Sequence, residues 1–328
     1  MAKIYYDKDA DIAPLKGKTI AIMGYGNQGQ AQAKNLRDSG CNVIIGSIKD
    51  ASYEQAKKDD FEVLDIAEAV KQVDIVHILI PDEYQASTYR DQIEPHLKVG
   101  KALCFSHGFN IHFKQIVPPK EVDVIMIAPK APGAMLRHMY EHGSGTPGLL
   151  AVEQDASGKA KEIALAMAKG VGLTRIGVVE TTFKEEVETD LFGEQAVLVG
   201  GVSELMVAGF ETLVEAGYQP EIAYFECINE LKLIVDLIYE HGIEGMMKAV
   251  SNTAEYGGRT RGKWIIDEKA RETMKKMLEE VKSGKFAKEW VDEAKSSLPN
   301  LRKMREEGNE HLVERVGKDL RKWAGIEK

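Results

Sequence analysis

The sequence predicts an α/β protein: an N-terminal Rossmann-type domain with a parallel sheet, followed by an all-α domain. Short runs rich in Ile and Val alternate with amphipathic segments in the first half, as in βαβ units. A glycine-rich loop directly follows the first clear apolar run, and after about Thr182 apolar residues recur every three or four positions. We therefore expect a dinucleotide-binding domain over residues 1–182 and a helical domain over residues 183–328.

Size and composition agree with two soluble domains. The 328 residues suffice for about two domains of roughly 150 residues. A net charge of −9 argues against nucleic acid and anionic membrane surfaces as partners. The three cysteines form no CxxC pair, and we see neither a secretory signal nor an apolar run long enough for a bilayer. We expect a cytoplasmic protein.

The strands of the first domain are expected where apolar runs end at turn residues. The run from Asp74 to Ile80 is almost continuously apolar, which is typical of a strand covered on both faces of its sheet. The expected strands are 19–23, 42–46, 75–80, 102–106, 124–128, 149–153 and 175–179.

The second half is expected to contain helices only. Residues 217–220 (GYQP) should break one helix from the next. The charge-rich stretch 302–328 is expected to be a solvated amphipathic helix.

The glycine-rich loop predicts a dinucleotide site. Residues 24–29 (GYGNQG) lie between a strand and a helical segment, and a second strand follows within about 30 residues. In this motif the glycines permit a tight turn, a close approach of the backbone to the pyrophosphate, and close helix–strand packing. That order favours a cofactor site over a plain glycine turn, so we expect cofactor contacts from Gly24, Tyr25, Gly26, Asn27, Gln28 and Gly29.

Two further segments are expected beside the cofactor. The end of the second strand carries Asp50, which would accept from ribose hydroxyls and repel a 2′-phosphate, whereas Lys49, Ser47 and Ser52 could bind one. A solvated loop is the alternative there. We weigh Asp50 most and expect NADH to be used well. Residues 81–85 follow the strand that holds His77, at the carboxyl edge of the sheet. We therefore also expect cofactor contacts from Asp82, Glu83, Tyr84 and Gln85.

Two acidic pairs stand four residues apart on predicted helices. Asp190 and Glu194 form one pair, and Glu226 and Glu230 form the other. At helical spacing both pairs continue into apolar stripes, so we expect them to face inward, where unpaired carboxylates are very costly. Four carboxylates are hard oxygen ligands that suit Mg²⁺ or Mn²⁺. The alternative is that they are ordinary surface charges, because many solvated helices carry acidic residues at this spacing. The stripes are Val197, Leu198, Gly201 and Leu205, then Leu233, Ile234 and Leu237.

Several segments together resemble ketol-acid reductoisomerase, the acetohydroxyacid isomeroreductase of branched-chain amino-acid biosynthesis. The resemblance is to the short form of the family and runs from Tyr5 to about Val291. This sequence departs from the family pattern at Gln30, Gln32, Ala131 and Asn229. The segments are 24–29, 106–112 (SHGFNIH), 128–133 (APKAPG), 188–195 (ETDLFGEQ), 223–232 (AYFECINELK) and 251–257 (SNTAEYG).

The resemblance implies an activity and a set of residue roles. The activity is Mg²⁺-dependent alkyl migration in 2-acetolactate or 2-aceto-2-hydroxybutyrate, followed by NADH or NADPH reduction to a 2,3-dihydroxy acid, in valine and isoleucine biosynthesis. It also implies a knotted helical domain and a homodimer, or a higher oligomer, with shared active sites. The implied residues are Asp190, Glu194, Glu226 and Glu230 for two Mg²⁺ ions, Ser251 for the substrate carboxylate, Gly133 beside the cofactor, and His107, Lys130 and Glu194 as catalytic groups.

Other interpretations remain at this point. A β-hydroxyacid dehydrogenase without metal, or a nucleotide-sensing dimeric scaffold, would also join a nucleotide domain to helices. Residue by residue, His107 could be a structural hydrogen-bonder, Lys130 a rigid loop lysine, and Ser251 a helix cap. We expect His77 to be a core histidine with its hydrogen bonds satisfied.

Overall fold

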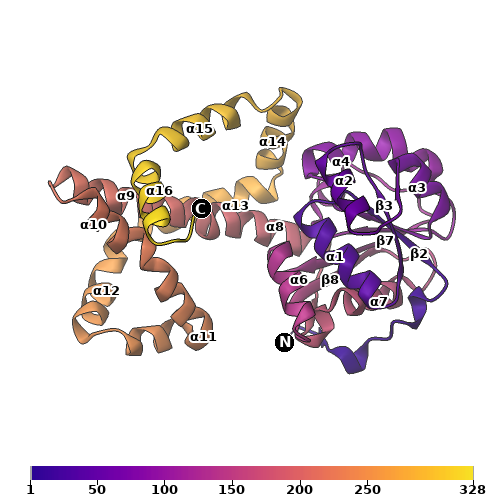
Figure 1. The fold of residues 1–328 in the computed structure, drawn as a ribbon, viewed down its shortest axis with the longest axis horizontal. Helices are drawn as coiled ribbons and strands as arrows, with labels where there is room; N and C mark the ends of the chain where they lie inside the picture. Colours follow the sequence, from indigo (N-terminus) through magenta and orange to yellow (C-terminus); the bar gives the residue numbers. More distant parts are fainter. Residues whose placement is uncertain (1, 328) are drawn as a thin grey trace. The chain divides into compact units, whose positions relative to one another are not determined.

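The computed structural model describes residues 2–327, which divide into two compact units (Figure 1). The first unit ends at Thr189 and the second begins at Asp190. The first is α/β and the second is entirely helical over its described residues, so the predicted fold class is confirmed. The two units are described separately below.

The first unit is built on one nine-stranded sheet. Its order is β1-β9-β8-β7-β6-β5-β2-β3-β4, so β2 lies between β3 and β5, and the strand order reverses at β2 and β5. The strands are β1 (Ile4–Tyr5), β2 (Thr19–Met23), β3 (Asn42–Gly46), β4 (Val63–Leu64), β5 (Ile75–Ile78), β6 (Ala102–Phe105), β7 (Asp123–Pro129), β8 (Gly148–Gln154) and β9 (Val178–Glu180).

The sheet corrects the sequence prediction in three places. It is mostly parallel, but β7 pairs with β8 and β1 with β9 in antiparallel fashion. The strand expected at 175–179 starts at Val178, because Leu173–Arg175 forms a 3₁₀ turn between Gly172 and Gly177, which have φ of 95° and 140°. Two-residue strands β1 and β4 are too short to show a periodic pattern and were not predicted.

Helices cover both faces of this sheet. On one face, Ala33 and Leu36 of α1 pack in the same buried cluster as Met167 of α7. On the other, Val70 of α3 and Phe183 of α8 pack with Phe105 of β6. The helices of this unit are α1 (Asn27–Asp38), α2 (Ala51–Lys58), α3 (Ile66–Gln72), α4 (Asp82–Thr88), α5 (Phe109–His112), α6 (Gly133–Glu141), α7 (Ala160–Val171) and the first turns of α8 (Phe183–Gly193).

The N-terminal segment is fastened to one edge of the sheet. Strand β1 pairs with β9, and the Tyr5 hydroxyl donates to Glu180 Oε2 at 2.7 Å. Lys169 Nζ donates to the carbonyl oxygens of Asp7 and Ala10, both at 2.8 Å. These contacts cover the outer edge of β9.

The second unit contains a small core. Phe210 of α9, Ala223 and Tyr224 of α10, and Val313 of α16 are buried together. Gly217, with φ of 90°, ends α9, and Pro220 begins α10, so the predicted break is confirmed. The elements are α9 (Gly200–Glu215), α10 (Pro220–Tyr224), α11 (Leu231–Ala249), α12 (Asn252–Ile265), α13 (Glu268–Lys282), α14 (Lys285–Lys295), α15 (Pro299–Glu310) and α16 (Leu312–Trp323).

The C-terminal stretch is two helices rather than the single solvated helix expected. α15 ends at Glu310, and the His311 side chain accepts from the backbone N–H of Val313 to begin α16. α16 is not wholly solvated, because Val313 is buried and Gly317 lies against the Tyr224 ring.

Two π-helical turns interrupt the second unit. The first, η6, covers Glu194–Leu198, and its closing bond runs from Val199 N to Glu194 O at 3.0 Å. The second, η7, covers Phe225–Asn229 and closes from Glu230 N to Phe225 O at 3.1 Å. Each π turn holds one residue more than an α-turn, and π turns are frequent at functional sites.

One helical run is long and apolar enough to cross a membrane, judged by length and composition only. It covers Phe183–Glu215, with mean hydropathy 1.6 in its most apolar window, of which 6% is buried in the structure. It is a helical run interrupted by acidic residues and not a continuous apolar segment. The run also carries Glu186, Asp190 and Glu194, charges that suit a bilayer interior poorly.

Candidate dinucleotide and catalytic site

A cavity of about 720 Å³ opens at the carboxyl ends of β2 and β5, where the strand order reverses. Ligands of open α/β sheets bind at this position. Most residues predicted to contact a cofactor line it, but Gly29, Lys49, Glu83 and Gly133 do not. Among its lining residues are Gly24, Tyr25, Gly26, Asn27, Gln28, Ser47, Asp50, Ser52, Asp82, Tyr84, Gln85, Ser106 and His107.

The glycines of the loop have different physical roles. Gly24 has a backbone φ of 93°, a conformation that residues with a side chain rarely adopt. A Cβ on Gly29 would lie 2.2 Å from Gly24 O, so Gly29 lets α1 start close behind the strand. A Cβ on Gly26 would meet nothing within 4 Å, which leaves its backbone open to the cavity. This arrangement fits a pyrophosphate at the N-terminus of α1.

Tyr25 belongs to the packing beneath the loop. Its ring lies edge-on to Phe61, and its hydroxyl donates to Asp59 Oδ2 at 2.9 Å. Burial, together with the hydrogen bond to Asp59, raises the pKa of Tyr25 well above its usual value. Tyr25 is therefore a neutral anchor for the loop.

The end of β3 holds the residues predicted to select the cofactor. Asp50 caps α2: its Oδ1 accepts from the Tyr53 backbone N–H at 3.0 Å. Ser47 is buried and Ser52 half-buried, and both line the cavity, whereas Lys49 is exposed and does not. Asp50, the residue that we expect to decide cofactor choice, thus also caps a helix, a role that the sequence analysis missed.

The segment after β5 is ordered by Gln85. Its Nε2 donates to Ile80 O at 2.9 Å and to Asp82 Oδ1 at 3.0 Å, and its Oε1 accepts from Asn110. Tyr84 is 56% exposed at the cavity rim, where its ring can cover a flat base. Gly133 opens α6, and a Cβ there would lie 2.0 Å from Asn27 O, so its role is close packing beside the loop.

A buried carboxylate joins two of the predicted catalytic residues. Glu186 is 1% exposed, and its Oε1 lies 3.1 Å from Nδ1 of His107 and 3.7 Å from Nζ of Lys130. Its Oε2 accepts from the Gly108 backbone N–H at 3.0 Å. His107 follows the end of β6, and Lys130 directly follows β7, so parallel strands bring both residues to the cavity edge of the sheet.

Sequence reasoning missed Glu186. The signal was available: Glu186 lies one helical turn before Asp190 on the same helix, so the acidic stripe of α8 extends backward. The second unit begins at Asp190, and Phe183 at the start of α8 is fixed by its edge-on contact with Phe105.

The expectation that the acidic pairs are buried is wrong for this chain. Asp190 is half-buried, but Glu194, Glu226 and Glu230 are exposed. The stripes are not covered either, because Leu198 is 69% and Leu233 is 58% exposed. Ser251 is exposed and caps α12 by accepting from Ala254 N at 3.2 Å.

The donor set of these positions still fits a hard cation. All four side chains are carboxylates, without thiolate or imidazole, which is the ligand chemistry of Mg²⁺. Glu194 begins η6, Glu226 lies in η7, and Glu230 directly follows it.

Comparison with known proteins decides the family. The profile described as "Acetohydroxy acid isomeroreductase, NADPH-binding domain" matches residues 14–177, and "Ketol-acid reductoisomerase, C-terminal domain" matches residues 183–325. The chain belongs to the ketol-acid reductoisomerase family. It is therefore an oxidoreductase with isomerase activity, of a family that serves branched-chain amino-acid biosynthesis, and it uses a nicotinamide cofactor. The metal-free dehydrogenase and scaffold interpretations are thereby set aside.

Relatives of the family match over their full length. The chain is 58% identical to "Ketol-acid reductoisomerase (NADP(+))" of Methanocaldococcus jannaschii, covering 100% of both chains. It is 60% identical to the Petrotoga mobilis enzyme of the same name, covering 98% of both. A solved NADH-preferring ketol-acid reductoisomerase from an uncultured archaeon superposes with TM-score 0.95, at 56% identity and 98% coverage of both chains.

Proposed function

We propose that this ketol-acid reductoisomerase converts 2-acetolactate, and 2-aceto-2-hydroxybutyrate, to the corresponding 2,3-dihydroxy acids. The observation that carries the proposal is the cluster of His107, Glu186 and Lys130 beside the dinucleotide cavity. In the substrate, the C2 hydroxyl loses its proton and the alkyl group migrates with its electron pair to the neighbouring carbonyl carbon. C2 thereby becomes a ketone, and the former carbonyl oxygen takes up a proton to become a hydroxyl. Hydride addition to C2 and protonation of its oxygen then give the diol.

The chain's own residues would hold and move protons. An ionised Glu186 only accepts hydrogen bonds, so Nδ1–H of His107 donates to it and Nε2 is left as the basic nitrogen. His107 lines the cavity, where Nε2 would exchange a proton with a substrate hydroxyl. Lys130 adds positive charge beside the developing oxyanion.

The residues that would hold two Mg²⁺ ions are Asp190, Glu194, Glu226 and Glu230. When bound, the ions supply Lewis acidity and the nicotinamide supplies the hydride. Ser251 would hold the substrate carboxylate, and Glu194 would also act on the substrate.

We propose a homodimer, or a larger assembly of dimers, in which each site takes Glu226, Glu230 and Ser251 from the second subunit. Exposed apolar side chains of the helical unit support this proposal, because a monomer rarely leaves so many uncovered. The knotted, interlocked arrangement implied by the family resemblance, and a cytoplasmic location, are part of the same proposal. The side chains are Val197, Leu198, Val199, Leu205, Leu233, Tyr239, Ile243, Tyr256, Trp264 and Ile265.

For the cofactor, we propose that NADH is used well. Asp50 lies at the cavity, and its carboxylate, which caps α2, would lie beside a 2′-phosphate and repel it. Ser47, Ser52 and the N-terminus of α2 favour the phosphate instead.

The deciding experiment measures oxidation of NADH and of NADPH, separately, with 2-acetolactate and with or without Mg²⁺. We expect turnover that is lost in chelator and restored by added Mg²⁺. The control is the same protein without acetolactate, which should not oxidise either cofactor. Folded protein that oxidises neither cofactor with acetolactate and Mg²⁺ would falsify the proposal.

A further inference from the structure

Four polar side chains form a buried cluster beneath the dinucleotide cavity. Gln32 of α1 and His77 of β5 are both 0% exposed. Gln28, one helical turn before Gln32, and Ser106, directly after β6, are half-buried and line the cavity. Such groups are costly inside a protein unless they bond to one another.

The carboxamide of Gln32 is the centre of the cluster. Its Nε2 donates to Gln28 Oε1 at 3.1 Å and to Ser106 Oγ at 3.0 Å. Its Oε1 lies 2.9 Å from His77 Nε2. Gln32 thus uses both of its N–H donors and its oxygen within the cluster, which ties α1 to two strands at once.

The hydrogen bonds have one consistent direction. Ser106 donates its only hydroxyl proton to Ile127 O at 2.9 Å, so it must accept from Gln32. Both Gln32 donors are then occupied, its oxygen accepts, and His77 must carry its proton on Nε2. Burial lowers the pKa of His77 to about 3, so its ring is neutral, and Nδ1 has no partner among the described residues.

The outer ends of the cluster reach the catalytic loops. Gln28 Nε2 donates to Ala131 O at 2.9 Å, and Ala131 directly follows Lys130. Ser106 directly precedes His107. The same bonds start from the first turns of α1, which follow the glycine loop. A shift of Gln32 would therefore reach the Lys130 loop through Gln28 and the His107 turn through Ser106.

We propose that Gln32, supported by His77, is a positioning residue that aligns the Lys130 loop and the His107 turn with the bound cofactor. The inference rests on the proposed function for the roles of Lys130 and His107. Gln32 contacts neither substrate nor hydride, and acts through Gln28 and Ser106. Because a misplacement of about 1 Å can cost as much as 10²-fold in rate, the loss of one amide should appear in turnover.

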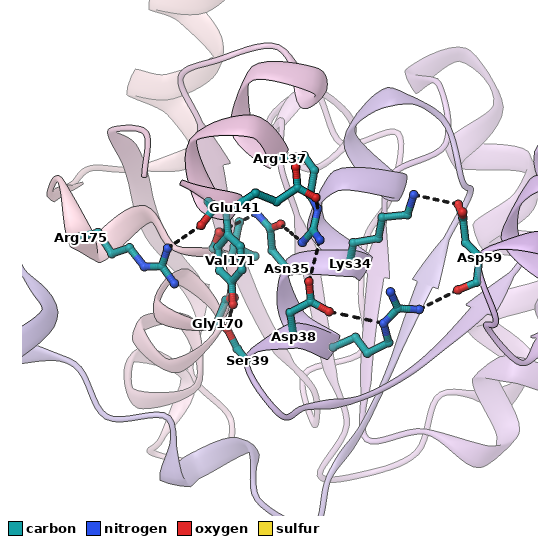
Figure 2. Close-up of polar contacts among 12 residues, drawn as sticks. Lys34, Asn35, Asp38, Ser39, Asp59, Arg137, Glu141, Gly170, Val171 and Arg175 are labelled. Carbon is teal, nitrogen blue, oxygen red and sulfur yellow. Dashed lines mark hydrogen bonds and ion pairs between the residues drawn. The ribbon is translucent and has the colours of Figure 1, made fainter. Parts of the chain in front are cut away.

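The test compares Gln32→Met, which keeps the length of the side chain and removes its polar atoms, with a matched control on the same helix. Asn35 is also 0% exposed, but its amide donates to Val171 O at 3.0 Å and accepts from Arg137 (Figure 2). Neither partner belongs to the cluster. Asn35→Ala therefore removes an equally buried amide without touching Gln28 or Ser106.

We expect Gln32→Met to lower kcat at least about tenfold while binding of ADP-ribose, which lacks the nicotinamide, stays within about twofold of the parent. If the parent uses NADPH, the probe is ADP-ribose 2′-phosphate instead of ADP-ribose. Asn35→Ala should keep kcat per mole of folded protein, whatever its stability. Equal kcat in Gln32→Met and Asn35→Ala, or a loss confined to ADP-ribose affinity, would overturn the proposal.

A second measurement does not depend on the reaction. Hydrogen exchange of backbone amides in residues 106–110 and 129–135 should quicken in Gln32→Met but not in Asn35→Ala. If the parent has no acetolactate activity, the proposed function fails, yet unchanged exchange in Gln32→Met would still overturn the positioning role. Should Gln32→Met not fold, the double variant Gln32→Met/His77→Leu replaces both partners by apolar groups, which is often nearly neutral for stability, and the same outcomes apply.

Discussion

At the scale of single residues, Glu186 has a central place in the site. A carboxylate that is 1% exposed is stable only with donors around it, and here they are His107, the Gly108 backbone N–H and the nearby Lys130 ammonium. The same bonds fix the His107 ring, so one buried charge orients the base and keeps the lysine close.

We expect Glu186→Gln to lower kcat by about 10²-fold, because an amide at this position can present its N–H₂ to His107 and no longer selects the Nε2-basic tautomer. Affinity for NADH, measured by fluorescence titration, should be unchanged, since Glu186 does not line the cofactor cavity. Asp38→Asn, which removes an exposed carboxylate at the far end of α1, is the control. Unaltered turnover in Glu186→Gln would show that His107 does not need this partner.

His77 gives a pH prediction at the same scale. Burial lowers its pKa from 6.5 to about 3, so the unfolded chain binds a proton below pH 6.5 that the folded chain refuses. Its contribution to stability is complete above pH 6.5 and is lost as pH falls toward 3, at up to about 1.4 kcal/mol per pH unit. Urea unfolding at pH 7, 6 and 5 should show a shallower pH dependence in His77→Leu than in the parent. Parallel curves would contradict the low pKa.

The residue scale also shows the limit of sequence reasoning. His107 and Lys130 could be singled out because short motifs mark them. The acidic stripe of α8 could have drawn attention to Glu186, but its partners could not be named, since they lie 79 and 56 positions away in sequence and meet it only through the sheet. His77 was expected to be satisfied, but only its Nε2 is bonded, a difference that depends on the direction of the hydrogen bonds around it.

At the scale of elements, two glycines of the glycine-rich loop have different roles, one in cofactor binding and one in packing. Gly26→Ala should leave the unfolding free energy nearly unchanged, because the new Cβ meets no atom, yet weaken NADH and NADPH binding at least about tenfold by occupying the space of the pyrophosphate. Gly29→Ala should instead destabilise the fold, since its Cβ would lie 2.2 Å from Gly24 O. Thermal unfolding and cofactor titration on both variants provide the comparison. Normal cofactor affinity in Gly26→Ala would place the pyrophosphate elsewhere.

The start of α2 gives the prediction on cofactor choice. Asp50→Ser keeps a good helix cap and removes the charge, so stability should change by less than about 0.5 kcal/mol. The ratio of kcat/KM for NADPH over NADH should rise about tenfold or more, because a carboxylate no longer faces the 2′-phosphate. If kcat/KM of the parent is already more than about tenfold higher for NADPH than for NADH, the attraction of Ser47, Ser52 and the N-terminus of α2 for the phosphate outweighs repulsion by Asp50. Our interpretation of this loop is then wrong.

The π turns explain part of the error about the acidic stripes. An α-helix turns about 100° per residue, so the extra residue of a π turn shifts every later side chain by roughly that angle. Continuing a stripe from Asp190 through η6 to Leu205 therefore assumes a phase that the helix does not keep. Local periodicity carries no mark of an i→i+5 bond.

At the scale of the whole molecule, the helical unit leaves apolar surface uncovered within one chain. Tyr239 is 88% and Trp264 is 71% exposed, while the core of this unit is small. The sequence could predict that this half is helical, because its periodicity is local. It could not predict which faces are covered, because that depends on contacts between residues far apart in sequence.

The proposed shared site can be tested by complementation. Glu194→Gln and Glu226→Gln, each inactive alone, should regain activity when they are unfolded together and refolded as a mixture, to about a quarter of the parent if subunits pair at random and each dimer keeps at most one intact site. Sedimentation should show no active monomer at any concentration. A fully active monomer, or mixtures as inactive as the separate variants, would place all four carboxylates within one chain.

The short strand β1 has a consequence for how the first unit resists aggregation. Strand β9 would otherwise present an open row of backbone donors and acceptors, and only two residues of β1, with Tyr5 and Lys169 as fasteners, cover it. Exposed strand edges recruit other chains. A small local opening, far short of global unfolding, is enough to uncover this edge. Aggregation on warming should therefore begin below the temperature at which the sheet unfolds. Its onset temperature depends on the contacts of Tyr5 with Glu180 and of Lys169 with Asp7.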